Sequence, residues 1–351
     1  GTSGEPKGVL HRFEALTRAA LMEAEHLGLS ARDAIYIPSP LAHQTGFLYG
    51  MWLALVLGSR QVIQGIWNGS HALRVLRETR CTFVQAATPF LADLVTAVGD
   101  GDRPPTDLRI FVATGAAVPR GLAERATRQL GTAVCGAWGT TETCLGTLSA
   151  PGDEPVKVWG TDGRPLRGID VRITDDEGRV LPVGTEGNFE LRGPTFFTGY
   201  LDRPDWTAAA LTADGFFRTG DLGILDADGY IRISGRVKDV INRGGEKVPV
   251  AEIEQILYDH PAVQDVAIVA MPDDRLGERA CAFVALRPHT DLSFQGMQKL
   301  LDAHQVSKHY WPERLEVIDR MPRNAAGKIQ KFALRERARG LRPQTEEELD
   351  R

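Results

Sequence analysis

Residues Ser234 to Glu254, SGRVKDVINRGGEKVPVAEIE, divide the chain into two parts with different sequence patterns. Within this stretch a charged turn, GRVKD at 235–239, separates two short β-type runs. Gly244 and Gly245 then interrupt the chain, because glycine readily adopts positive φ angles that other residues avoid. Pro249 opens a predicted helix, as proline does at a first helical position. The pattern is consistent both with a surface hairpin and with a hinge between a large and a small domain.

Short β-type runs alternate with helical patterns in the part that precedes this stretch. Strands are predicted at Ala34–Ile37, Val62–Ile66, Thr82–Ala87, Leu108–Thr114 and Ala133–Trp138. Ser70 is a candidate N-cap for one of the intervening helices. This alternation predicts an α/β fold, with a mostly parallel sheet layered with helices. Ligands of such sheets bind beyond the carboxyl ends of the strands, here the Gly115 turn and the segment Gly139–Glu142.

The pattern changes again between Val156 and Ser234, where short strands and hairpin turns predict an antiparallel, β-barrel-like subdomain of the large domain. After the dividing stretch, alternating strand and helix patterns predict a small α+β domain. Its strands are expected at Asp265–Ala270, Ala280–Leu286 and Arg314–Ile318, and its helices at Leu292–Ala303 and Lys331–Ala338. We therefore expect a large domain over residues 1–237 and a small, mobile C-terminal domain over 238–351, with a hinge near Lys238.

Composition narrows the class of protein. The chain has 351 residues, of which 42% are hydrophobic and 25% charged, as expected for two soluble domains. Its net charge of −5 argues against nucleic acid as a partner. The apolar run Gly46–Leu57 is too short for a transmembrane segment, which needs roughly 20 residues. The cysteines form no CxxC pair and no zinc spacing, which favours reduced thiols and a cytoplasmic protein: Cys81, Cys135, Cys144 and Cys281.

The first residues are glycine-rich and carry hydroxyls and a lysine, a composition suited to wrapping phosphates with backbone N–H groups and one cation. The residues of this loop are Thr2, Ser3, Gly4 and Lys7. Lys7 is followed by glycine, so the loop is not a Walker A motif. A loop of this kind normally follows a strand, and none precedes it here. We therefore expect the large domain to be truncated at its N-terminus.

Three further motifs carry side chains that could take part in binding or catalysis. Gly139-Thr140-Thr141-Glu142 places a carboxylate at the end of a strand, where it could hold Mg²⁺ through oxygen or simply cap a helix. Asp221 could accept hydrogen bonds from two ribose hydroxyls or be an ordinary turn aspartate. Lys328 lies in a loop of small residues, PRNAAGK, and could be catalytic or merely solvated.

The order of these motifs resembles that of the AMP-forming adenylate-forming superfamily, which contains acyl-CoA synthetases, nonribosomal peptide adenylation domains and luciferases. The motifs that carry the resemblance are TSGEPKG, GAA, WGTTE, RTGDLG, GRVKDVINRGGEKV and PRNAAGKIQK. The resemblance extends from Gly1 to about Ala338. Because the family's phosphate loop begins a few residues before Gly1, it also implies that an N-terminal portion is missing.

The resemblance implies a role for each matching position. Nucleotide-binding residues would be Thr2, Ser3, Gly4, Lys7, Gly115, Ala116, Ala117, Trp138, Gly139, Thr140, Asp221 and Arg236. Catalytic residues would be Lys328, Thr141 and Glu142, with Glu142 holding Mg²⁺. Gly244 and Gly245 would line the tunnel for CoA, and Lys238 would be the hinge. Trp138 replaces the more usual tyrosine or phenylalanine, but it keeps the flat aromatic face that stacks on adenine.

The segment PLAHQTGF at 40–47 resembles the acyl-pocket motif of fatty acyl-CoA synthetases, in the short- and medium-chain branch that includes cyclohexanecarboxylate ligases. His43, Gly46 and Gly146 would then border the acyl pocket, although His43 could also be a core histidine. The implied reaction uses ATP, Mg²⁺ and CoA as co-substrate to convert a carboxylic acid to acyl-AMP and then to a thioester. Two alternatives stay open: an acyl-AMP ligase or adenylation domain that loads a carrier protein, and a catalytically incompetent nucleotide-binding fragment.

Overall fold

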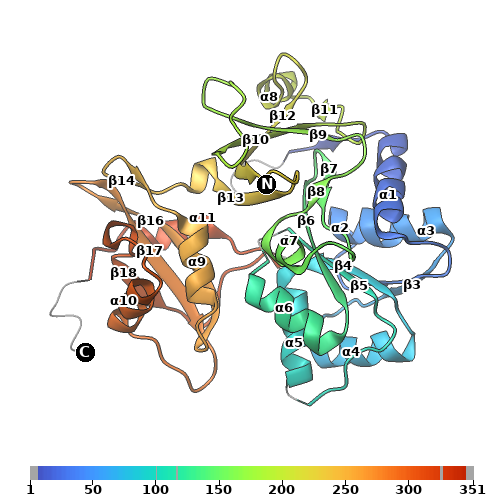
Figure 1. Cartoon of the computed structure of the whole chain (residues 1–351), viewed down its shortest axis with the longest axis horizontal. Coiled ribbons are helices and arrows are strands. Elements are labelled where there is room, and N and C mark those ends of the chain that lie inside the picture. The colour runs from blue at the N-terminus through green and yellow to red at the C-terminus, as the bar shows by residue number, and fades with distance from the viewer. Residues whose placement is uncertain (1–6, 100, 116–117, 325–326, 345–351) are drawn as a thin grey trace. The chain divides into compact units, whose positions relative to one another are not determined.

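The computed structural model describes residues 7–99, 101–115, 118–324 and 327–344, and contacts divide them into two compact units. The large unit contains the described residues up to Ile233, together with Gly327 and Lys328. The small unit contains the other described residues from Ser234 onward. The boundary between the two units therefore falls between Ile233 and Ser234, inside the strand Ile231–Arg236. The hinge expected near Lys238 stays a prediction. Figure 1 labels the elements of both units.

The large unit is organised around a seven-stranded sheet with the order β3-β2-β4-β5-β6-β7-β8. Its first five members are parallel: β3 (Arg60–Ile63), β2 (Ala34–Ile37), β4 (Phe83–Ala87), β5 (Ile110–Thr114) and β6 (Ala133–Thr140). Strands β7 (Cys144–Leu148) and β8 (Arg164–Pro165) are antiparallel additions. Every residue of β2 and β5 is buried, as expected when helices cover both faces of a parallel sheet. The predicted α/β fold is confirmed.

Helices connect the parallel strands and supply the cover. Their bounds are α1 (Phe13–Leu27), α2 (Gln44–Gly46), the π-helix η1 (Phe47–Trp52), α3 (Leu53–Leu57), α4 (Gly69–Glu78), α5 (Thr88–Gly99), α6 (Arg120–Leu130) and α7 (Pro155–Gly160). The apolar run Gly46–Leu57 is a partly buried helical segment with Leu48, Tyr49 and Leu53 in the core. No helix among the described residues is long and apolar enough to cross a membrane.

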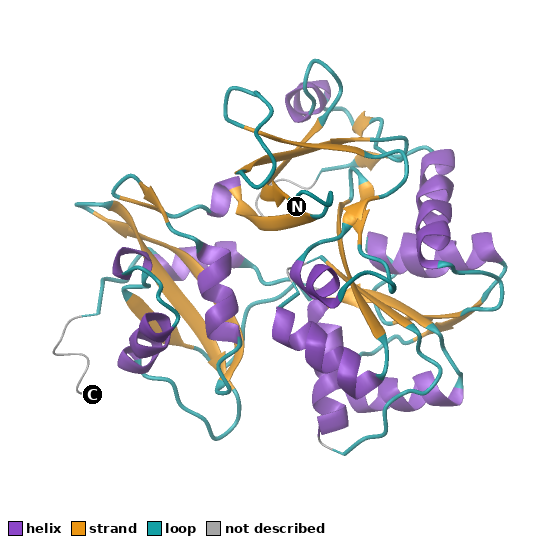
Figure 2. Ribbon diagram, in the orientation of Figure 1, coloured by secondary structure: helices purple, strands orange, loops and turns teal. Residues whose placement is uncertain are grey.

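Antiparallel strands complete the large unit, as Figure 2 shows in orange. A four-stranded sheet has the order β13-β12-β10-β9, formed by β9 (Asp170–Thr174), β10 (Glu186–Arg192), β12 (Phe217–Leu225) and β13 (Ile231–Arg236). Helix α8 (Pro204–Ala210) follows a two-stranded ribbon of β1 (Val9–Leu10) and β11 (Gly199–Tyr200). This ribbon joins the start of the described chain to the antiparallel subdomain.

The small unit is the predicted α+β domain. Its sheet has the order β15-β14-β17-β16, with β18 beside β17. The strands are β14 (Asn242–Arg243), β15 (Glu246–Lys247), β16 (Val263–Asp273), β17 (Gly277–Leu286) and β18 (Arg314–Val317). The helices are α9 (Val250–Tyr258), α10 (Phe294–Ala303) and α11 (Lys331–Ala338), with short 3-10 turns η2 (Val237–Asp239) and η3 (Lys308–Tyr310). The two opposite faces of β16 and β17 each bury an apolar cluster. One cluster includes residues of α9 and α10, and the other includes residues of α11.

Candidate active site

The carboxyl end of β6 reverses sharply into β7 and presents the predicted Thr141 and Glu142. Gly139 faces Leu145 in this turn, and a Cβ at Gly139 would collide with the carbonyl oxygen of Cys144. Cys144 itself has a φ of 59°, a left-handed conformation that is uncommon for residues other than glycine. The segment is thus a tight strand–turn–strand, and the helix-cap alternative for this motif is wrong.

Side chains from distant parts of the chain fix this turn. His11 Nε2 lies 2.6 Å from the carbonyl oxygen of Thr141, and Gln44 Nε2 donates to the same oxygen at 3.4 Å. Tyr200 Oη donates a hydrogen bond of 2.7 Å to Glu142 Oε1. Burial and the neighbouring Glu142 raise the pKa of Tyr200, so its hydroxyl remains a donor. Sequence reasoning missed His11 and Tyr200, and no local pattern around either residue signals the contact.

The structure brings together two of the residues expected to contact adenine and ribose, Trp138 and Asp221. The indole N–H of Trp138 donates a 2.8 Å hydrogen bond to Asp221 Oδ2, and both side chains are buried. The Trp138 ring packs edge-on against Phe189 with centroids 4.8 Å apart. Asp221 lies in β12, where its backbone N–H donates to the hydroxyl of Thr219. Asp221 is therefore not an ordinary turn aspartate, because it lies in a strand and its buried carboxylate accepts a hydrogen bond from Trp138.

A second carboxyl, Asp162, lies near Asp221. Desolvation raises the pKa of Asp162 to about 6, and the negative charge of Asp221 adds to the rise. The backbone N–H of Ile233 donates to Asp162 Oδ2 at 2.8 Å and opposes this rise. The positive charge of Arg232 also opposes the rise, so burial is the main cause of the raised pKa of Asp162.

The three residues expected at the acyl pocket have different surroundings. His43 precedes α2, and its Nδ1 accepts the backbone N–H of Thr45 at 3.2 Å. Partial burial lowers the pKa of His43, and the positive charge of Lys328 lowers it further. A Cβ at Gly46 would collide with backbone carbonyls of the preceding turn. A Cβ at Gly146 would lie 2.5 Å from Leu191 and 3.1 Å from the Trp138 ring. The absence of a side chain at this position therefore lets Leu191 and the indole pack closely against the backbone.

The remaining predicted residues are distributed as follows. Thr2, Ser3, Gly4, Ala116 and Ala117 lie outside the described residues. Gly115 directly follows β5 and has a φ of 81°, and Lys328 is half-buried within the large unit.

Four predicted residues belong to the small unit: Arg236, Lys238, Gly244 and Gly245. Gly244 and Gly245 have φ angles of 62° and 97°, which confirms the predicted glycine break. Asp239, which follows Lys238, is bound by Arg335 of α11 at 2.5 Å.

Glu142 is the residue that the sequence predicts to hold a magnesium ion. No group of three or more histidine, cysteine, aspartate or glutamate side chains that could hold a metal occurs in the part of the chain that is described. Mg²⁺ is commonly bound by only one or two carboxylates together with substrate phosphates and water. A single carboxylate on a fixed turn at the end of β6 is compatible with that mode of binding.

Comparisons with known proteins identify the family to which the chain is similar. Residues 1–201 match the AMP-binding enzyme family, and residues 252–328 match the AMP-binding enzyme C-terminal domain. The medium-chain fatty-acid–CoA ligase of Escherichia coli (strain K12) is 38% identical over 95% of this chain and 59% of its own length. A salicylyl-CoA synthase / salicylate adenylyltransferase of a Streptomyces species is 33% identical over 96% of this chain and 62% of its own length. The chain thus spans about three fifths of the length of these curated relatives.

A solved structure gives the same result at the level of the fold. The crystal structure of ATP-bound MatB from Rhodopseudomonas palustris has a TM-score of 0.91 and 28% identity, over 97% of this chain and 67% of that protein. Taken with the family matches and with Trp138, Asp221 and Glu142 in one unit, this likeness shows that the chain belongs to the AMP-binding enzyme family, the adenylate-forming superfamily.

Proposed function

We propose that this chain belongs to an AMP-forming carboxylate–CoA ligase that acts on a short- or medium-chain or alicyclic acid. The observation that carries the proposal is the buried Trp138–Asp221 pair in the same unit as the Glu142 turn. A flat aromatic face, a buried carboxylate and a second carboxylate are what adenine, ribose hydroxyls and a magnesium–phosphate group need. The 38% identity to a protein named medium-chain fatty-acid–CoA ligase supports the choice of acid.

Each residue would contribute a distinct physical effect in this reaction. Trp138 would stack on adenine while its N–H keeps the Asp221 carboxylate oriented toward the ribose hydroxyls. When bound by Glu142, Mg²⁺ would supply positive charge beside the phosphates. Lys328 would stabilise the negative charge that develops as the acid attacks the α-phosphate, and preorganised charge of this kind is usually the largest catalytic effect. Its half-buried place in the large unit supports this role over that of a solvated lysine.

The acceptor of the acyl group distinguishes the proposal from its main alternative, an acyl-AMP ligase or an adenylation domain that loads a carrier protein. The relative named salicylate adenylyltransferase keeps that alternative open. The experiment is a panel of carboxylic acids with ATP on the complete gene product, with pyrophosphate exchange and AMP release measured with and without CoA. Exchange with CoA-dependent AMP release is expected. Exchange without any CoA effect would favour the acyl-AMP ligase, and absence of both would favour a catalytically incompetent nucleotide-binding protein.

We also propose that the small unit moves between the two half-reactions about Lys238. Lys328 is joined at Ile329 to the small unit, so the movement would withdraw Lys328 after adenylation and would bring the Gly244-Gly245 tunnel into use for thioester formation. Lys238 is exposed and lies in the short η2 turn, in which no residue is buried. A change in the φ and ψ angles of Lys238 during the movement would therefore displace no buried side chain of that turn. Lys238→Pro fixes φ near −65°. It should spare acyl-AMP formation from ATP and slow thioester formation from supplied acyl-AMP, and equal loss of both steps in a folded variant would contradict the hinge.

A further inference from the structure

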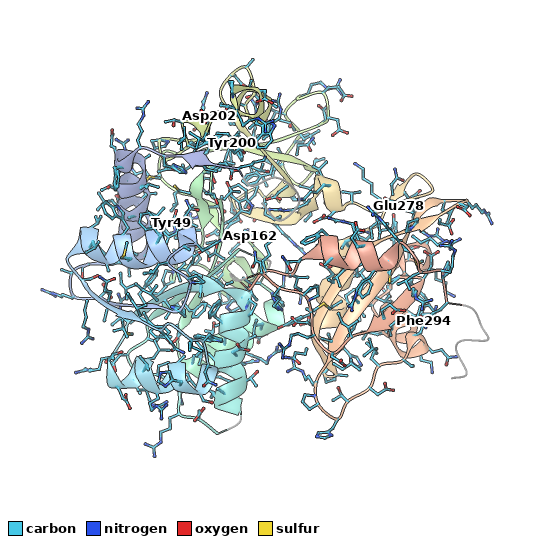
Figure 3. All side chains as sticks on the ribbon, turned by 180° about the vertical axis from the view of Figure 1, so that it is seen from behind. Tyr49, Asp162, Tyr200, Asp202, Glu278 and Phe294 are labelled. Atoms are coloured by element: carbon cyan, nitrogen blue, oxygen red, sulfur yellow. The ribbon has the colours of Figure 1, made fainter. Side chains whose placement is uncertain are left out.

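Tyr200 lies between two groups that the proposed reaction uses, Glu142 and Lys7. Its hydroxyl donates to Glu142 Oε1 at 2.7 Å. The ammonium group of Lys7 lies over the face of the same ring, 4.8 Å from its centroid, and 5.4 Å from the ring of Trp206. One side chain therefore contacts both the carboxylate expected to hold Mg²⁺ and the lysine of the phosphate loop. Figure 3 labels Tyr200 among the side chains of the large unit.

The backbone on both sides holds Tyr200 firmly in this place. Strand β11 pairs with β1, so that Tyr200 faces Val9. The N–H of Leu201 also donates to the carbonyl oxygen of Gly8 at 2.7 Å. The backbone N–H of Tyr200 donates to Thr207 Oγ1, and only 6% of the residue is exposed. Tyr200 is thereby attached to the chain directly after Lys7, and its ring has little freedom to turn.

The two contacts have complementary electrostatic effects. The hydroxyl occupies one oxygen of Glu142 and so orients the carboxylate. The ring face attracts the Lys7 ammonium by a cation–π interaction, which gives this cation a partner other than Glu142. An ammonium bound to Glu142 would neutralise the charge that a metal ion needs.

We propose that Tyr200 is a positioning residue of the nucleotide site, which orients Glu142 for Mg²⁺ and keeps Lys7 from pairing with that carboxylate. The inference rests on the proposed function and adds a residue to its machinery. Hydrogen-bond partners of metal-binding carboxylates typically contribute about 10–100-fold to metal affinity or activity. Loss of the hydroxyl should therefore change the requirement for Mg²⁺ more than any other property of the protein.

The test is calorimetric titration of the complete gene product with ATP at a series of free Mg²⁺ concentrations. Tyr200→Phe keeps the ring and removes only the hydroxyl. The free Mg²⁺ that gives half of the metal-dependent gain in ATP affinity should rise about tenfold or more in this variant. Its ATP affinity in EDTA should stay at the wild-type value. A residue with a merely structural role would weaken binding equally with and without the metal.

Tyr230→Phe is the matched control, because its hydroxyl lies beside another carboxylate, that of Asp153, in the same unit. We expect a wild-type Mg²⁺ requirement for this variant. An unchanged or lower requirement in Tyr200→Phe, or an equal rise in Tyr230→Phe, would overturn the inference and leave the proposed function intact. Absence of Mg²⁺-dependent ATP binding by the wild-type protein would overturn both.

Discussion

Replacing Trp138 by phenylalanine separates the two roles of this side chain, its flat face and its N–H donor. The aromatic face is retained, so stacking on adenine should survive in large part. The hydrogen bond to Asp221 Oδ2 is lost, and Asp221 is only 3% exposed, so little water can replace the donor. The variant therefore leaves a buried carboxylate with one donor fewer in the proposed nucleotide site.

The expected magnitude follows from the burial of both partners. A hydrogen bond to a charged group contributes about 1.5–3 kcal/mol, and the atoms lost from the 8%-exposed indole add a smaller term for packing against Phe189. We expect the free energy of unfolding of the large unit to fall by about 2–4 kcal/mol. If displacement of Asp221 costs ATP binding about 1 kcal/mol, the affinity for ATP should fall roughly fivefold.

Urea denaturation and calorimetry on Trp138→Phe, Asp221→Asn and the double variant would give the coupling between the two side chains. A coupling energy of about 1–3 kcal/mol is expected, and a value within about 0.5 kcal/mol of zero would refute the reasoning. Trp67→Phe is the matched control, since the Trp67 indole donates at 2.6 Å to Asp93, which is exposed. This control should lose less than about 1 kcal/mol of stability and keep wild-type ATP affinity.

Three further substitutions test the site and its support. Burial raises the pKa of Asp162 from its ordinary value of 3.8 to about 6, so its contribution to stability is present below pH 4 and lost as pH rises through 6. The free energy of unfolding of Asp162→Asn, measured by urea denaturation, should change little between pH 4 and pH 6. At pH 7 it should exceed that of the wild-type protein by up to about 3 kcal/mol. Gly139→Ala forces a Cβ against Cys144 and should lower the melting temperature by several degrees, whereas Gly152→Ala, with open space around it, should not. Lys328→Ala should slow acyl-AMP formation by about 10²–10³-fold yet still convert supplied acyl-AMP and CoA to thioester.

The core of the fold is predictable because buried parallel strands leave a clear pattern. The run Ala34–Ile37 is identical to β2, and the predicted strand at Ala133–Trp138 is β6 without its last two residues. Boundaries set by single side chains are less certain. Ser70 was expected to cap a helix, but α4 begins at Gly69 because Asn68 Oδ1 accepts the N–H of His71. Several polar residues stand at that helix start, and which one caps it depends on the path of the preceding loop.

The contacts that complete the site are harder to predict, because they join residues far apart in the chain. Tyr200 is 58 residues from Glu142, and His11 is 130 residues from Thr141. The partner of each group is determined by how β1, β11 and the β6–β7 turn meet, and no local pattern encodes that meeting. The motif residues could be named from the sequence, whereas the residues that orient them required the structure.

The strained turn after β6 explains why those orienting contacts are numerous. A residue other than glycine at positive φ, such as Cys144, costs about 1–3 kcal/mol and persists only where its surroundings over-determine it. Tyr49 Oη accepts the N–H of Leu145 at 2.5 Å, and the hydroxyls of Thr140 and Thr143 accept each other's backbone N–H at 3.2 Å. These bonds stabilise a turn that an isolated peptide would not adopt. Because the turn is fixed during folding, the Glu142 carboxylate would need little reorganisation in the proposed reaction, and preorganisation of this kind is what makes electrostatic catalysis effective.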